Sequence, residues 1–283
     1  MRDGGDQPIE PLQTYTPAML ALSRTVRFCL SGHPGDLDRP RDNTFSSWPA
    51  MRGLGRYYEL DVTCAGEADA QTGYFINIKA IDQVVREHVL PMLADRVSDE
   101  ADAAAMPMGQ LMRDVFEAID PPLDKTVSQV RLVLTPMLSL GIERDDMDQV
   151  VMRQQYEFSA AHRLHVPALN DEQNRVTFGK CNNLAGHGHN YRVEVAARCP
   201  VDAQGQALSP AELDAVVDRE AIEKLDHKHL NIDVPQFAEL NPSVENIVKV
   251  VWQMLVGKLP GGATLDEVKV WETGKTVCAY RGE

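Results

Sequence analysis

The chain has 283 residues, enough for two domains of about 140 residues that each bury a core. Its formal net charge of −14 argues against a nucleic-acid-binding protein, because such proteins usually carry a basic face. No apolar run approaches the roughly 20 residues of a membrane span, and the N-terminus lacks a signal peptide's apolar core. We therefore expect a cytoplasmic protein with no nucleic-acid or membrane partner. Its 5 scattered cysteines indicate free thiols rather than disulfides.

The first predicted element is a strand in the segment "GRYYELDV". Its apolar side chains Tyr58, Leu60 and Val62 alternate with polar ones, a period of two that predicts a strand with one buried face. Further along, the acidic segment 141–150 is polar enough to run along the surface. We expect a linker between two domains there.

The second half begins with an apparent strand in "YEFSAAH" and continues with two predicted helices. Ser209 as N-cap, Pro210 at the first helical position and Glu212 closing a capping box predict a helix from residue 210. A second helix is expected after Ser243, because the apolar residues that follow recur at helical spacing. These apolar positions are Ile247, Val250, Val251 and Met254.

Three strands complete the predicted second half. Residues 191–197 alternate with a period of two, and the segments 267–273 and 276–282 read as two short strands. The first half shows a similar order of elements. Each half therefore reads ββααββ, an α+β arrangement in which an antiparallel sheet carries two helices.

Four stretches of the first half echo stretches of the second half in the same order. "GLGRYYELDV" lies over "GHGHNYRVEV", "ADAQTG" over "VDAQG", "IDQVV" over "LDAVV", and "VRLVLTP" over "VKVWETG". The offset drifts by a few residues, but the order of the matches is preserved, and such self-similarity is the signature of a repeated unit. The sequence predicts a tandem duplication with one domain in residues 1–145 and another in residues 146–283.

Histidines are concentrated in the second half, where three of them can form a metal site. His187 and His189 stand two apart on a predicted strand, so both side chains point to one face. A hairpin would return His162, at the end of the preceding strand, beside them. Three imidazoles leave the fourth position of a tetrahedral zinc open, as in catalytic sites.

Each of these features also has a structural reading. A lone His-x-His on a strand is more often a surface or packing feature, and Cys181 alone reads as a small buried hydrophobe. "LDHKHLN" can be a polar helix end, and Glu272 can simply face solvent. The functional reading rests on all of them occurring in order within one half.

Five stretches of the second half together resemble the 6-pyruvoyl-tetrahydropterin synthase family. They are "FSAAHRL", "GKCNNLAGHGHNY", "LDHKHLN", "VPQFAELNPSVEN" and "VKVWETGKTVCAYRGE". The resemblance covers about residues 156–283. It implies the tunnelling fold (T-fold), in which several subunits build a barrel with sites between them. Matched position by position, it also implies that His162, His187 and His189 bind zinc.

The resemblance further implies a base, a proton relay and a substrate pocket. Cys181 matches the family's catalytic cysteine, the general base, and Asp226 with His227 matches the pair that completes the relay. Glu272 matches the glutamate that anchors the pterin ring. Ser243 and Glu245 fall at substrate contacts, although "NPSVEN" departs from the commoner Thr-rich form.

The substrate implied by the resemblance is 7,8-dihydroneopterin triphosphate, which loses triphosphate to give 6-pyruvoyl-tetrahydropterin. Lys180, Arg163 and Lys228 are candidates for receiving the triphosphate. The rival product is that of 6-carboxytetrahydropterin synthase. The five residues between Cys181 and the first histidine resemble the pyruvoyl branch, whereas "LNPSVEN" leans toward the carboxy branch.

The first half lacks the functional residues that align with the second, so we expect it to bind neither zinc nor pterin. A third reading of the whole chain is accordingly a pterin-binding protein with weakened catalysis. A fused pair would supply two barrel segments per chain, which predicts a homo-oligomer of three tandem chains. The replacing residues are Trp48, Leu54, Arg56, Ala94, Asp95 and Leu134.

Overall fold

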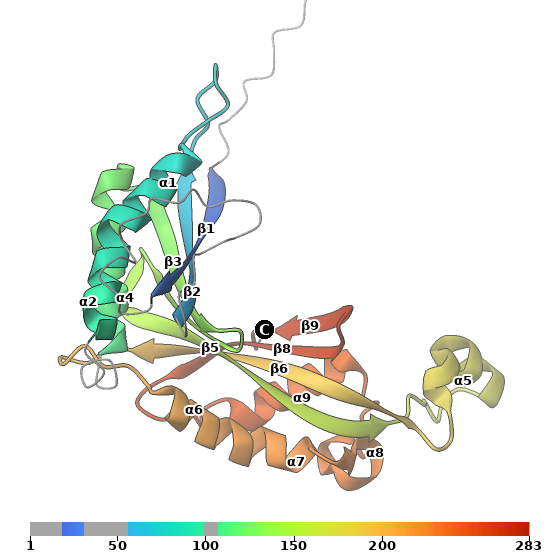
Figure 1. The fold of residues 1–283 in the computed structure, drawn as a ribbon. Coiled ribbons are helices and arrows are strands. Elements are labelled where there is room, and N and C mark those ends of the chain that lie inside the picture. Colours follow the sequence, from blue (N-terminus) through green and yellow to red (C-terminus); the bar gives the residue numbers. More distant parts are fainter. Residues whose placement is uncertain (1–18, 31–55, 99–106, 283) are drawn as a thin grey trace, which may run out of the picture.

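The computed structural model describes residues 19–30, 56–98 and 107–282. Its strands form one sheet in the order β1-β2-β3-β4-β5-β6-β8-β9, with every neighbouring pair antiparallel. The short β7 pairs in parallel with Ala160 and Ala161, near the C-terminal end of β5. Within the described residues the sheet stays open and does not close into a barrel. The two halves follow one another along this sheet (Figure 1).

The expected ββααββ order is present in both halves. In the first half the elements are β1 (Leu20–Leu30), β2 (Arg56–Gly66), α1 (Ile78–Val84), a π turn (Val85–Val89), α2 (Leu90–Ser98), α4 (Met108–Ile119), β3 (Val127–Thr135) and β4 (Leu138–Glu143). In the second half they are β5 (Asp146–His162), α5 (Asp171–Phe178), β6 (His187–Pro200), α6 (Pro210–Val217), a π turn (Asp218–Ile222), α7 (Glu223–Leu225), β7 (Lys228–His229), α8 (Leu230–Asp233), α9 (Val244–Leu255), β8 (Thr264–Thr273) and β9 (Thr276–Tyr280).

Both predicted helices of the second half are confirmed, with the expected caps. The Ser209 side chain accepts from the backbone N–H of Glu212, and the Glu212 side chain accepts from the backbone N–H of Ser209. This reciprocal pair satisfies donors that the first helical turn leaves free. Ser243 is the N-cap of α9, and the apolar stripe of α9 is buried against the sheet.

The expected surface linker is wrong. β4 and β5 form a hairpin in which Leu140 lies opposite Met152 and Gly141 opposite Val151, with a turn at residues 144–145. The segment that looked like a linker supplies the end of one strand and the start of the next. The pairing joins the two halves into one continuous sheet.

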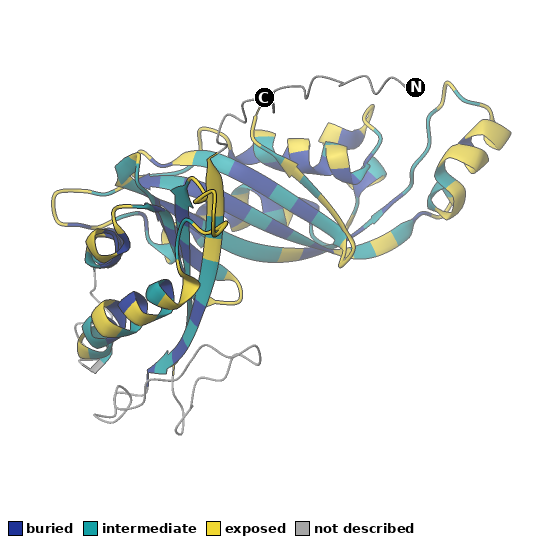
Figure 2. Cartoon of the chain, turned by 90° about the horizontal axis from the view of Figure 1, so that it is seen from above, coloured by how far each residue is buried: buried dark blue, intermediate teal, exposed yellow. Residues whose placement is uncertain are grey.

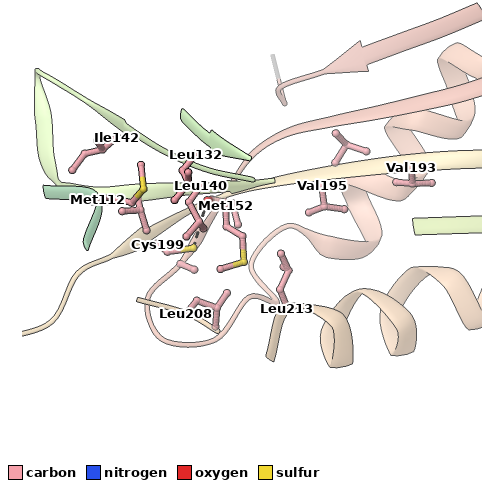
Figure 3. Packing of buried hydrophobic residues seen from close by; sticks show 14 of the residues in the cluster. Met112, Leu132, Leu140, Ile142, Met152, Val193, Val195, Cys199, Leu208 and Leu213 are labelled. Atoms are coloured by element: carbon pink, nitrogen blue, oxygen red, sulfur yellow. Dashed lines mark hydrogen bonds between the residues drawn. The ribbon is translucent and has the colours of Figure 1, made fainter. Parts of the chain in front are cut away.

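The helices of both halves cover the same face of this sheet, and that face carries the core (Figures 1 and 2). Buried side chains from β3, β4, β5 and β6 meet where the halves join, beside Met112 of α4 and Leu213 of α6 (Figure 3). Fully burying a large aliphatic side chain contributes about 1.5–3 kcal/mol. The opposite face is polar, with ion pairs such as Arg131–Asp61 at 2.7 Å.

The two halves share strand register and irregularities as well as element order. Leu60 lies opposite Leu132 in the first half, and Val193 lies opposite Val270 in the second. Counted from these opposite pairs, the β-bulges of the two halves lie at equivalent positions. One bulge follows Thr63 in β2 and Ala196 in β6, and another follows Val133 in β3 and Trp271 in β8. In each half a π turn also follows the first helix after the second strand, α1 in the first half and α6 in the second.

Among the described residues, none of the helices combines the length and the apolar character that crossing a membrane would require.

Candidate metal centre and active site

Three histidines converge where β5 ends and β6 begins. His162 of β5 lies directly opposite His187 of β6, and His189 is two residues further along the same face. The Nε2 atoms of His162 and His187 are 3.2 Å apart. One ring nitrogen from each of the three residues lies within 4.8 Å of the others. The antiparallel pairing of β5 with β6 and the convergence of the three histidines are as expected, and zinc binding by them stays a prediction.

The ring of His162 is fixed by a hydrogen bond that defines its tautomer. Its Nδ1 lies 2.7 Å from the carbonyl oxygen of Pro242, and the side chain is fully buried. Because a carbonyl only accepts, Nδ1 must carry the proton, and Nε2 of the neutral ring then presents a lone pair. A backbone carbonyl orienting a ligating histidine in this way is a common feature of protein metal sites.

The cluster fits a tetrahedral zinc ion. Two nitrogen ligands at about 2.0–2.1 Å from zinc are about 3.3 Å apart, close to the observed 3.2 Å between His162 and His187. Within the described part of the chain, the buried atom His189 Nε2 has no hydrogen-bond partner. Buried polar atoms are normally satisfied, so an unpartnered nitrogen at this position suits a metal ligand.

Burial keeps His162 and His187 neutral near pH 7. It lowers the pKa of His162 to about 4, and the neighbouring His187 and His189 add to this shift, whereas the bond to Pro242 opposes it. Burial, followed by the proximity of His189, also lowers the pKa of His187. Neutral imidazole is the form that binds metal.

Glu272 points its carboxylate at this cluster. Its Oε1 lies 3.5 Å from His162 Nε2 and 3.8 Å from His189 Nε2. Glu272 follows Trp271, which lies opposite Arg192 of β6. The sequence left open whether Glu272 faces solvent, and the structure shows its side chain only 21% exposed beside the histidines.

Cys181 lies on one side of the cluster. It lines a pocket of about 850 Å³ together with His187, and Arg163, Lys180 and Arg175 contribute positive charge to the same pocket. Burial raises the pKa of the Cys181 thiol, and the negative charge of Glu272 adds to the shift. Only a nearby cation would counter both effects and favour the thiolate.

Asp226 and His227 lie on another side. His227 Nδ1 is 2.7 Å from the Asp226 carboxylate, and the other Asp226 oxygen accepts from the backbone N–H of Ser159 at 2.8 Å. These bonds, with that from Ser159 the stronger, lower the pKa of Asp226. His227 and His189 line a pocket of about 570 Å³ that does not include Cys181. The pair is therefore formed as predicted, but within one chain it does not share a pocket with Cys181.

Comparison with known proteins places this site in a family. A family model described as 6-pyruvoyl tetrahydropterin synthase matches residues 151–283. The 6-pyruvoyl tetrahydrobiopterin synthase of Homo sapiens is 41% identical over 136 residues, which are 48% of this chain and 93% of that protein. The chain belongs to the 6-pyruvoyl tetrahydropterin synthase family.

Two further relatives cover a similar share of the chain. The synthase of Drosophila melanogaster is 44% identical over 126 residues, 44% of this chain and 75% of that protein. The solved structure of the Caenorhabditis elegans synthase is 36% identical, with a TM-score of 0.45, and covers 48% of this chain and 96% of that one. The three histidines, Cys181 and Glu272 all lie inside the residues that match the synthase family.

Ser243 and Glu245, whose surrounding sequence departs from the commoner synthase pattern, lie at the start of α9. Ser243 is the N-cap, directly after the Pro242 carbonyl that holds His162. Its side chain makes no capping hydrogen bond. Glu245 is exposed in the first helical turn. Ser243 is therefore next to the cluster, and a substrate contact of Glu245 stays a prediction.

The first half carries no counterpart of the synthase cluster at the positions that the structure describes. Arg56, opposite Leu30 in β2, takes the place that His189 holds opposite Ala160. Trp48 and Leu54 lie outside the described residues.

The alignment of the relay pair with the first half is wrong. α2 runs on through Ala94 and Asp95, whereas α7 ends at Leu225, directly before Asp226. At this point the first half is still helical, so it lacks the turn that follows α7 and leads to the edge of the sheet.

Sequence reasoning missed two side chains at the synthase site. Tyr191 was predicted only as part of a buried strand face, yet its ring packs edge-on against His162 and its buried hydroxyl has no hydrogen-bond partner among the described residues. His229 stands in the motif "LDHKHLN", but the sequence indicates no separate role for it. It lies close enough to His162 to help lower the pKa of that ring. An alternation pattern indicates burial but not which buried side chain carries a polar end into a site.

Gly186 should be intolerant of any side chain. Its φ of 71° is left-handed, and a Cβ there would lie 2.8 Å from His229 Nε2 and 2.9 Å from the His162 carbonyl oxygen. We expect Gly186→Ala to lower the free energy of unfolding by about 1–3 kcal/mol, as strained backbone positions do. Urea denaturation measures this. Gly274→Ala is the matched control, because a Cβ at Gly274 meets no atom within 4 Å.

Proposed function

We propose that this chain is a zinc-dependent 6-pyruvoyltetrahydropterin synthase, a lyase that converts 7,8-dihydroneopterin triphosphate into 6-pyruvoyl-tetrahydropterin and triphosphate. The observation that carries the proposal is the convergence of three imidazoles, that of His162 fully buried, with a carboxylate, flanked by a cysteine pocket. It stands in the half that matches relatives named as synthases of this kind.

Each residue has a role that its surroundings support. Zinc, held by His162, His187 and His189, would act as a Lewis acid that acidifies C–H and O–H bonds next to the substrate's side-chain oxygens. Cys181 Sγ would accept a proton from the substrate side chain as general base. Glu272 offers two acceptor oxygens that match the adjacent N–H donors of a pterin's 2-amino pyrimidinone edge.

The proposed role of the Asp226–His227 pair requires a second fold unit. Asp226 holds His227 by one carboxylate oxygen, which orients the imidazole for proton transfer. The side chain of His227 is 83% exposed and shares no pocket with Cys181 of its own chain. We propose that His227 serves the substrate at the metal centre of a neighbouring unit in the assembled enzyme.

Arg163 and Lys180, both in the Cys181 pocket, are the proposed triphosphate contacts, with Arg175 added by the structure. Phosphate oxygens are well matched by guanidinium and ammonium donors. Lys228 lines the pocket of His227 instead. It is therefore a weaker candidate for the same chain's substrate.

The deciding experiment is incubation of the zinc-loaded full chain with dihydroneopterin triphosphate, followed by mass analysis of the pterin. A pyruvoyl side chain with released triphosphate supports the proposal. A carboxylated product would assign the chain to the carboxy branch, and unchanged substrate that still binds would indicate a pterin-binding protein.

We also propose that residues 1–145 and 146–283 are two copies of one T-fold unit, the first catalytically silent. The shared register and the matching bulges support this. Three such chains would supply the six fold units of a barrel assembly. Native mass spectrometry should show a species of three chains carrying one zinc ion each. A stable monomer, or two zinc ions per chain, would contradict the proposal.

A further inference from the structure

A further pocket lies where the two halves join, on the face of the sheet opposite the helices. Its volume of about 570 Å³ is within the range of small-molecule sites. β2, β3, β4 and the turn between β3 and β4 line it from the first half, and β5 and β6 line it from the second. It shares no residue with the histidine cluster or with the pockets of Cys181 and His227. It is therefore a separate cavity that neither half forms alone.

Arg153 brings an unpaired positive charge to this junction pocket. Its Nη1 atom is buried without a hydrogen-bond partner, and no carboxylate of the described residues forms an ion pair with the guanidinium. Burial lowers the pKa of Arg153, although the carboxylates of Asp266 and Glu194, too far away for an ion pair, oppose the shift. Buried cations are normally paired with an anion. Arg153 is thus a candidate anion-binding residue.

The neighbours of Arg153 in the sheet are small. Ser139 of β4 and Ala196 of β6 lie directly opposite Arg153. A Cβ added at Gly141 would lie 3.5 Å from Arg153 Nη1, so the guanidinium lies against the Gly141 backbone. The Ser139 hydroxyl also lines the junction pocket and makes no hydrogen bond to a described residue. It is a second free donor beside the guanidinium.

The other charged groups that line the junction pocket already have partners. Their ion pairs are Arg131–Asp61, Arg27–Glu59 and Lys269–Glu194, at 2.7, 3.0 and 3.2 Å. These pairs balance, so Arg153 leaves one positive charge uncompensated. One such charge matches a monoanion, and the formal net charge of −14 of the whole chain disfavours polyanions.

The opposite wall of the junction pocket is apolar. Val133, Leu134, Pro136 and Met137, at the end of β3 and in the turn after it, supply this wall. Met137 is 43% exposed, so its side chain has surface left to bury against a ligand. A guanidinium matches the planar geometry of a carboxylate, and the apolar wall matches a hydrocarbon or aromatic body.

We propose that the junction pocket binds a small monocarboxylate with an apolar body, whose carboxylate is held by Arg153 and Ser139. The first half, which has no histidine cluster in its described residues, supplies the apolar wall of this site. The inference concerns a second ligand site and does not depend on the proposed lyase activity.

Calorimetric titration of the full chain with benzoate, acetate and inorganic phosphate tests the inference. Benzoate should bind saturably at one site per chain, at least about tenfold more tightly than acetate, because its ring buries apolar surface that acetate lacks. Arg153→Gln should weaken benzoate binding by about 10- to 100-fold, the effect of losing a hydrogen bond to a charged group. Arg192→Gln is the matched control, because it removes a cation that stacks on Trp271 outside the pocket. It should leave benzoate affinity unchanged.

A second variant and the thermal stability separate loss of the site from loss of the fold. Ser139→Ala removes only a hydroxyl and should weaken benzoate binding by about 2- to 10-fold. Arg153→Gln removes a buried unpaired charge, so without ligand it should melt no lower than the wild type. Benzoate should raise the melting temperature of the wild type and leave that of Arg153→Gln unchanged.

Three results would overturn the inference. The first is an absence of saturable benzoate binding, or binding that Arg153→Gln and Ser139→Ala leave unchanged. The second is phosphate binding as tight as that of benzoate, which would remove the need for an apolar body. The third is loss of the assembled species in native mass spectrometry of Arg153→Gln, which would identify the anion as a carboxylate of a neighbouring chain.

Discussion

Replacing Cys181 with alanine should lower kcat by about 10²- to 10⁴-fold, the range over which a positioned general base contributes. The reason is that the Cys181 pocket holds no other described side chain suited to accept a proton, apart from the proposed metal ligand His187 and the surface carboxylate Asp171. Zinc content should stay at one ion per chain, because Cys181 is not part of the histidine cluster. Steady-state kinetics and elemental analysis on the same preparation measure both.

Cys278→Ala is the matched control for this experiment. Cys278 is also a free, half-buried thiol, but it lies on β9 opposite Val270. Its replacement should leave turnover unchanged. If Cys181→Ala retained wild-type kcat, the assignment of Cys181 as base would be wrong, whatever the product of the reaction.

His162→Ala should abolish zinc binding and weaken the fold. The substitution removes one of three proposed ligands and leaves the Pro242 carbonyl without the donor it has now, which costs about 1–3 kcal/mol for a buried group. Because a ligand that binds only the folded state stabilises it, zinc should raise the melting temperature of the wild type. It should leave that of His162→Ala unchanged.

Calorimetry with and without added zinc gives both quantities. His88→Ala, at an exposed histidine of the first half, should behave as the wild type. A variant at His162 that still bound zinc with wild-type affinity would mean that the ion is held elsewhere.

Much of the fold was predictable because its signals are local. The capping box at Ser209 and Glu212 and the alternation around Tyr191 are fixed by neighbouring residues, and the structure confirms the elements that they indicate. His162, His187 and His189 could also be grouped from sequence, because two of them share a strand face and a hairpin supplies the third.

The remaining features depend on contacts between distant segments. Segment 141–150 looks like a linker by composition, yet it pairs as strands because β3 and β6 offer neighbours on both sides. The contact of Glu272 with His162 depends on how β8 is placed beside β6. The separation of His227 from Cys181 likewise follows from β7 pairing with the far side of β5.

The π turns and β-bulges occur in both halves, so the first half shows whether they depend on a nearby functional site. π turns and β-bulges often mark functional sites, and the second half alone would invite that interpretation for the bulge after Ala196 and the π turn after Val217. The first half keeps both features, after Thr63 and Val84, without a histidine cluster in its described residues. The packing of helices on a twisted sheet, rather than the reaction, must therefore maintain these distortions. Substitutions at these positions should change the free energy of unfolding rather than the catalytic activity.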